Sequence, residues 1–194
     1  MPTQGHFPTP MYWDQVHGEK FKAIQNELFL TYQKLKFSRK KGWGKDTHYL
    51  SEDPFTRDIL TDMDCKLFLN FLDKSLNNYL DQIGFQFERK YHITQSWFTK
   101  TCKGQYAHRH DHGANDIAGV YYLQTNERDG NIYFQTPLQL LTPNFIYGCI
   151  NGDQQIQAKE GLIGLWPGVL EHGTYTNTTD HERISISFNI QYER

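Results

Sequence analysis

The second half of the chain, from Phe85 onward, is built from short runs of aromatic and β-branched residues. Gly, Asn, Asp and Pro separate these runs, as is typical of strands joined by turns. The candidate strands are 85–99, 105–110, 116–123, 131–135, 144–150, 154–158, 161–166, 170–175 and 183–192. Eight or nine short strands within roughly 110 residues predict a sandwich or a double-sheet jelly roll.

The first half of the chain has helical periodicity instead. One apolar stripe has the three- and four-residue steps of a helix face and comprises Phe21, Ile24, Leu28, Tyr32 and Leu35. A second helix fits 62–83, with Gly84 as its C-terminal cap, and 38–45, with two glycines, fits a loop. We therefore expect a single domain over 1–194, in which 1–84 is mainly helical support and 85–194 is an all-β core with the helices packed outside.

Composition argues against several classes of protein. Apolar residues make up 38% of the chain and aromatic residues 15%, which is enough for a compact core. Lys and Arg number 20 against 22 Asp and Glu, and Arg39 to Lys41 is the longest basic run, so nucleic acid is not the expected partner. The nearly apolar stretch 161–170 is too short to cross a bilayer and contains Pro167.

The cysteines and the N-terminus indicate the compartment. Cys65, Cys102 and Cys149 lie far apart without a CxxC spacing, which is typical of a reducing environment rather than a disulfide framework. We expect all three to be buried small residues. The first residues lack the charged start and apolar run of a signal peptide. The expected location is the cytoplasm, or the host cytoplasm if a phage encodes the chain.

Three histidines alternate in the sequence AHRHDHG, at His108, His110 and His112. Side chains at positions i and i+2 of a strand point to the same side, so two of these imidazoles can bind one ion. Neutral imidazole suits iron, zinc, copper and nickel. The stretch is therefore a candidate metal site.

A later histidine and an arginine extend this pattern. His172 follows an apolar strand, and Arg183 begins the alternating strand RISISFNIQ eleven residues further on. A guanidinium forms a bidentate pair with a carboxylate, and the hydroxyl of Ser185, two residues on, can join it. One strand away from a metal, Arg183 could hold the distal carboxylate of a ligand that chelates the ion.

Together these motifs resemble the iron(II)- and 2-oxoglutarate-dependent oxygenases, and more narrowly a bacterial and phage family of them. The motifs that carry the resemblance are QSWF at 95–98, HDH at 110–112, AGVYYL at 118–123, WPGVLEH at 166–172 and RISISFN at 183–189. They cover roughly 90–192, while GWGKDTHYL at 42–50 matches more loosely. The family fold is a double-stranded β-helix, or jelly roll, with helices outside.

The resemblance also implies roles for single residues. His110, His112 and His172 match the ligands of Fe(II), and Arg183 matches the residue that holds the 2-oxoglutarate C5 carboxylate, with Ser185 as its helper. In such enzymes the strand that corresponds to the one with Tyr122 often places a polar side chain beside that carboxylate. Tyr122 is therefore a candidate for this role, and Tyr121 is the alternative residue that could face the pocket. Trp97 either lines the pocket or packs in the core.

One position departs from the commoner pattern, because His112 stands where many relatives have Asp. His108 and Asp111 therefore remain alternatives for the third ligand. The activity that the resemblance implies is hydroxylation of a second substrate, a small molecule or peptide, with dioxygen consumed and succinate and carbon dioxide released. Two alternatives are a cupin-like metal-binding protein without oxygenase activity and a three-histidine dioxygenase that needs no 2-oxoglutarate. The oligomeric state is left open, a homodimer included.

Overall fold

The computed structural model describes residues 9–88, 90–138, 143, 145, 149 and 153–193. Its strands are β1 (Tyr12–Gln15), β2 (Phe37–Ser38), β3 (Tyr49–Ser51), β4 (Tyr91–Thr101), β5 (Ile117–Gln124), β6 (Ile132–Phe134), β7 (Gln154–Ile156), β8 (Leu162–Pro167), β9 (His172–Thr174) and β10 (Arg183–Tyr192). Its helices are α1 (Gly18–Tyr32), α2 (Ile59–Asp62) and α3 (Lys66–Gln82).

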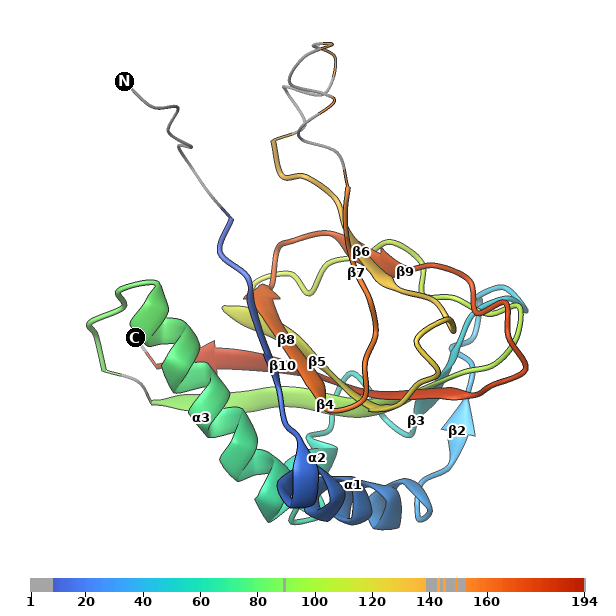
Figure 1. The fold of residues 1–194 in the computed structure, drawn as a ribbon, viewed down its shortest axis with the longest axis horizontal. Coiled ribbons are helices and arrows are strands. Elements are labelled where there is room, and N and C mark those ends of the chain that lie inside the picture. The colour runs from blue at the N-terminus through green and yellow to red at the C-terminus, as the bar shows by residue number, and fades with distance from the viewer. Residues whose placement is uncertain are drawn as a thin grey trace.

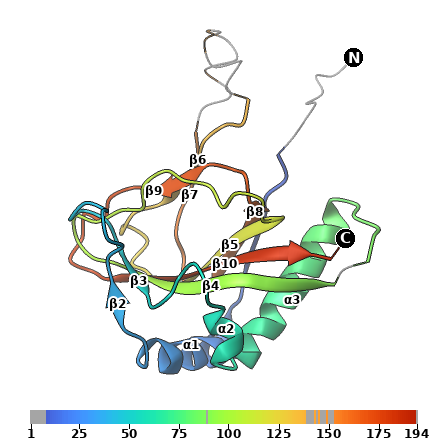
Figure 2. The same ribbon diagram turned by 180° about the vertical axis from the view of Figure 1, so that it is seen from behind.

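The strands form two sheets that face each other (Figure 1). The larger sheet has seven strands in the order β1-β8-β5-β10-β4-β3-β2, and the smaller has three in the order β7-β6-β9. All pairings between these strands are antiparallel. The three helices lie against the face of the larger sheet that points away from the smaller one (Figure 2). The predicted all-β jelly-roll core is confirmed.

Strand alternation divides the apolar side chains between two cores. On β5, Tyr121 joins the core between the helices and the larger sheet, whereas Val120 and Tyr122 join the core between the sheets. On β10, the isoleucines and Phe188 face the helices, and Arg183 and Ser185 face the other way. Because side chains alternate along a strand, β10 supplies a polar row to the space between the sheets.

Several predicted element boundaries differ from the structure. The segment 105–110 is not a strand and makes only isolated bridges at Tyr106 and His110. The helix predicted over 62–83 begins later, at Lys66, because Asp64 has a φ of 56° between α2 and α3. The short strands β1, β2 and β3 were not predicted, and most of the predicted strand 144–150 lies outside the described residues.

The cysteines follow the prediction only in part. Cys65 is buried, whereas Cys102 is half-buried and Cys149 is exposed. The expectation that all three are buried is therefore wrong for two of them. Among the described residues, none of the helices combines the length and the apolar character that crossing a membrane would require.

Candidate metal centre

Three histidines from two segments of the chain meet at one point between the sheets. His172 is the first residue of β9. Its backbone N donates to the His110 carbonyl at 2.9 Å, and the His110 N donates to the His172 carbonyl at 2.9 Å. The backbone N of His112 donates to the Gly168 carbonyl at 2.8 Å. These backbone contacts bring one ring nitrogen of each histidine within 4.8 Å of the others.

Hydrogen bonds fix the same tautomer on all three rings. Nδ1 lies 2.7 Å from the His108 carbonyl in His110 and 2.9 Å from the Leu170 carbonyl in His172. A carbonyl oxygen only accepts, so each Nδ1 carries the proton. In His112, Nδ1 lies 2.5 Å from Asn189 Oδ1. The Asn189 amide is oriented by its own donation to Gln95 Oε1 at 2.7 Å.

This arrangement leaves three unprotonated Nε2 atoms. Those of His112 and His172 are 3.3 Å apart, with no hydrogen available to lie between them. Two lone pairs at this distance repel unless a cation lies between them. Two nitrogens that bind one ion at about 2.1 Å and near a right angle are about 3 Å apart. The donor set therefore fits a divalent transition metal such as iron(II).

The surroundings keep the cluster neutral. His172 is buried, His112 is half-buried, and His110 keeps an exposed face. Burial lowers the pKa of His112 to about 4 and the pKa of His172 well below its usual range, and the neighbouring histidines lower both further. Burial against neighbouring protein atoms also lowers the pKa of His110. Near neutral pH the three rings therefore present lone pairs rather than charges.

Neither alternative ligand lies in this cluster. The Asp111 carboxylate accepts a hydrogen bond from the backbone N of Gly113 at 2.8 Å. The ring of His108 packs edge-on against Tyr106 at 4.7 Å between centroids. In the described part of the chain the set of donors that could share an ion consists of His110, His112 and His172.

Arg183 lies in the same cavity with an unusual set of partners. Its side chain is buried, and one terminal nitrogen donates to the carbonyls of Asp129 and Gly130. The other reaches the hydroxyls of Thr101 and Thr174, both at 3.3 Å. Nε has no partner, and in the described residues no carboxylate lies within ion-pair distance of the guanidinium. Burial lowers the pKa of Arg183. The buried Asp129 carboxylate favours the charged guanidinium, but without a direct ion pair. A buried charge without a counter-ion in contact is costly, so the site fits an anion.

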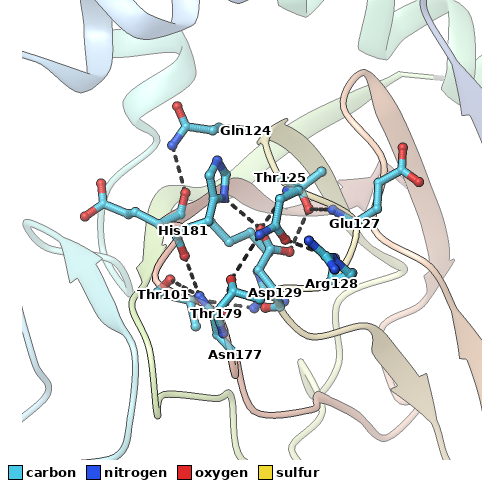
Figure 3. Close-up of polar contacts among 12 residues, drawn as sticks. Thr101, Gln124, Thr125, Glu127, Arg128, Asp129, Asn177, Thr179 and His181 are labelled. Atoms are coloured by element: carbon cyan, nitrogen blue, oxygen red, sulfur yellow. Dashed lines mark hydrogen bonds and ion pairs between the residues drawn. The ribbon is translucent and has the colours of Figure 1, made fainter.

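A polar network fixes the turn whose Asp129 and Gly130 carbonyls accept hydrogen bonds from Arg183 (Figure 3). The buried Asp129 carboxylate accepts from Thr125 Oγ1 at 2.6 Å and from Asn126 N at 3.0 Å, and His181 Nδ1 lies 3.1 Å away. Asn177 donates to the carbonyl of His181 at 2.7 Å. Because these bonds fix the 125–131 turn, the guanidinium is held in one orientation.

Gly130 is required at this turn for two reasons. Its φ of +98° is rarely adopted by other residues, and a Cβ at this position would overlap the Tyr175 carbonyl and come within 3.2 Å of the Arg183 guanidinium. Sequence reasoning had not selected Asp129, Gly130 or Asn177. They resemble ordinary turn residues, and only the position of Arg183 shows what the turn does.

A cavity of about 430 Å³ joins the histidines to Arg183. Ser185 and Tyr122 line it and are paired across β10 and β5. Tyr121 does not line it and packs instead against Phe68 of α3. Trp97 lines it and stacks on the ring of His112 at 5.8 Å.

His48 is a further buried residue of this cavity that sequence reasoning did not select. It is 6% exposed, and its Nδ1 lies 3.1 Å from the Tyr106 carbonyl, so Nδ1 is the protonated nitrogen. Burial lowers its pKa to about 4, and the positive charge of Arg183 acts in the same direction.

The depressed pKa of His48 predicts a pH dependence of stability. In the unfolded chain an imidazole titrates near its ordinary value of about 6.5, so the unfolded state binds the proton first as the pH falls. The contribution of His48 is full above about pH 6.5 and is lost between there and about pH 4. We expect the unfolding free energy of the chelator-treated protein to fall from pH 7 to pH 5, with about 1–2 kcal/mol arising from His48. Urea titrations should show a shallower dependence for His48→Gln, and equal slopes would contradict the prediction.

One family model matches the part of the chain that carries the histidine cluster and the buried arginine. Residues 95–189 match the family model described as "Putative 2OG-Fe(II) oxygenase". The matched part contains His110, His112, His172 and Arg183. A search of curated proteins found no sequence match.

Solved structures with the same fold come from enzymes of different activity. A Pseudomonas putida prolyl-4-hydroxylase is 12% identical, with a TM-score of 0.61 over 96% of this chain and 94% of its own. SnoN, a non-heme alpha-ketoglutarate-dependent epimerase of nogalamycin biosynthesis, is 12% identical, with a TM-score of 0.67 over 95% and 78%. HygX from Streptomyces hygroscopicus, with nickel, 2-oxoglutarate and hygromycin B bound, is 13% identical, with a TM-score of 0.58 over 95% and 83%. At such low identity the likeness shows the fold alone.

Proposed function

We propose that the chain is an iron(II)- and 2-oxoglutarate-dependent dioxygenase, in which His110, His112 and His172 bind the iron. The observation that carries this proposal is the buried guanidinium of Arg183, which has no carboxylate partner in the described residues and shares a cavity with three unprotonated Nε2 atoms. A ligand with a chelating end and a distal carboxylate would satisfy both features.

Each side chain then has a defined task. The bonds from Nδ1 to the carbonyls of His108 and Leu170 keep Nε2 of His110 and His172 aimed at the ion. Arg183 binds the C5 carboxylate of 2-oxoglutarate, and Ser185 and Tyr122 offer hydroxyl groups beside it. When bound, iron(II) would supply the activation of dioxygen and the oxidation of a C–H bond. The protein contributes the orientation of the ligands and the shape of the cavity.

The experiment is a measurement of succinate. Protein loaded with iron(II) and 2-oxoglutarate without oxygen should release succinate when oxygen is added, even without a second substrate. Omission of iron should abolish the release. Metal binding without succinate release would favour the cupin-like alternative, and a lack of 2-oxoglutarate affinity would favour the three-histidine dioxygenase.

The partners of such an enzyme are dioxygen and a second substrate, which is a small molecule or a peptide. The cytoplasm is the proposed location, because the three cysteines have no framework spacing. Sedimentation at equilibrium would determine whether the chain is a monomer or a homodimer.

A further inference from the structure

The loop between α1 and α2 lines one side of the cavity. Lys40, Trp43, His48 and Phe55 line the cavity together with Trp97 of β4. The first four lie outside the family match, which begins at residue 95. This part of the cavity therefore comes from the part of the chain that the family model does not describe.

The loop has a fixed backbone. The Trp43 N donates to the Lys40 carbonyl at 3.1 Å, and Gly42 has a φ of +89° in the turn between them. Both the N and the hydroxyl of Thr47 bond to the Gly44 carbonyl. At the other end, Gln95 of β4 donates to the Phe55 carbonyl at 3.0 Å. Hydrogen bonds therefore fix the backbone on which the rings of Trp43 and Phe55 stand.

Ring contacts connect the metal cluster to this loop. Trp97 stacks on His112, and Phe55 lies 6.5 Å from Trp97 between centroids. The Lys40 ammonium lies 4.2 Å from the centroid of Phe55 and 5.2 Å from that of Trp43. We call Lys40, Trp43, Phe55 and Trp97 the recognition wall. Trp43 is 37% exposed and Phe55 45% exposed, so both rings offer apolar surface to a ligand.

One cation of the cavity has no carboxylate partner in the described part of the chain. Among the described residues that line the cavity, Lys40, Arg183 and Asp111 carry a full charge at neutral pH, and the buried Asp129 carboxylate acts on Arg183 from outside the lining. Among the described residues no carboxylate lies within ion-pair distance of Lys40. Iron(II) and the 2-oxoglutarate dianion would cancel each other. Lys40 would then remain as a cation without a carboxylate partner among the described residues, which favours a second substrate with one negative charge.

We infer that the second substrate is a flat, largely apolar ring with one anionic group, a carboxylate or a phosphate. Trp43, Phe55 and Trp97 contact the ring, and Lys40 contacts the anion. This assignment rests on the proposed function for its charge balance and for the position of the reacting atom beside the metal. The wall itself is formed by the protein alone.

Matched pairs of probes test this inference. Indole-3-acetate is compared with neutral indole-3-acetamide, and thymidine 5′-phosphate with thymidine, by calorimetry on the full chain loaded with manganese(II) and 2-oxoglutarate. We expect the anionic member of at least one pair to bind roughly five- to tenfold more tightly than its neutral partner. The pair with the larger ratio identifies the anion as a carboxylate or a phosphate.

Variants separate the charge from the rings. Lys40→Met should bring the ratio of anionic to neutral probe affinity close to one, whereas Lys40→Arg should keep it. Lys45→Met is the matched control, because Lys45 is exposed and does not line the cavity. Phe55→Ala should weaken the binding of both probes of a pair by a similar factor, since Phe55 contacts the aromatic ring that the two probes share.

Two results would overturn the inference: a ratio that Lys40→Met leaves unchanged, or no binding of either anionic probe. Failure of the proposed function is seen separately, as a lack of 2-oxoglutarate binding in the same calorimeter. Repeating the titrations on metal-free protein then shows whether Lys40 still selects the anion without the metal.

Discussion

The variant His172→Ala is expected to lose nearly all bound iron. His172 is the most deeply buried of the three histidines, and its Nε2 lies 3.3 Å from that of His112. Its removal leaves two imidazoles, of which His110 is exposed on one side. Changes to groups that only orient a ligand already cost about 10–100-fold in metal affinity, so the loss of a ligand should cost at least about 100-fold. Iron content after anaerobic loading and desalting measures the effect.

A neighbouring histidine provides the matched control. His108→Ala removes an imidazole from the same segment but outside the cluster, and it should keep the iron content of the parent. Circular dichroism of both variants checks that the jelly roll is retained. If His172→Ala binds iron as the parent does, or if His108→Ala loses it, the proposed ligand set is wrong.

The sequence selected the residues of this cluster partly for a reason that the structure does not support. We expected His110 and His112 to share one side of a strand, but 105–110 is not a strand. The two rings converge because His110 bonds to the backbone of His172 and His112 bonds to Gly168. Spacing in the sequence identified the residues, whereas the contacts that orient them join segments about 60 residues apart, which no local pattern reveals.

The polar row of β10 was predicted more directly. Alternation along 183–189 placed Arg183 and Ser185 on one face, and the structure places both in the cavity. The sequence could not indicate which other segments of the chain line the cavity opposite β10. The turn at Gly130 and the loop with Lys40 and His48 meet the cavity only through tertiary packing, and in the sequence they have the composition of ordinary turns.

Replacement of Arg183 with methionine should reduce 2-oxoglutarate affinity by tens to thousands of fold. Among the described residues that line the cavity, the guanidinium is the only buried cation. Loss of one partner of a buried charge pair costs on the order of 2–5 kcal/mol. Methionine has similar length but leaves the carbonyl of Gly130 without this donor. Calorimetry on protein loaded with manganese(II) measures the affinity without turnover.

The metal provides the internal control for this variant. The Nδ1 groups of the three imidazoles donate to the His108 and Leu170 carbonyls and to Asn189 Oδ1, and none of them bonds to Arg183. Arg183→Met should therefore bind manganese(II) as the parent does. Arg183→Lys retains a charge but not the planar fork, and its affinity should fall between those of the parent and the methionine variant. Near-normal 2-oxoglutarate affinity in a folded, metal-binding Arg183→Met protein would show that the carboxylate binds elsewhere. The buried guanidinium would then serve only to hold the turn at Asp129 and Gly130.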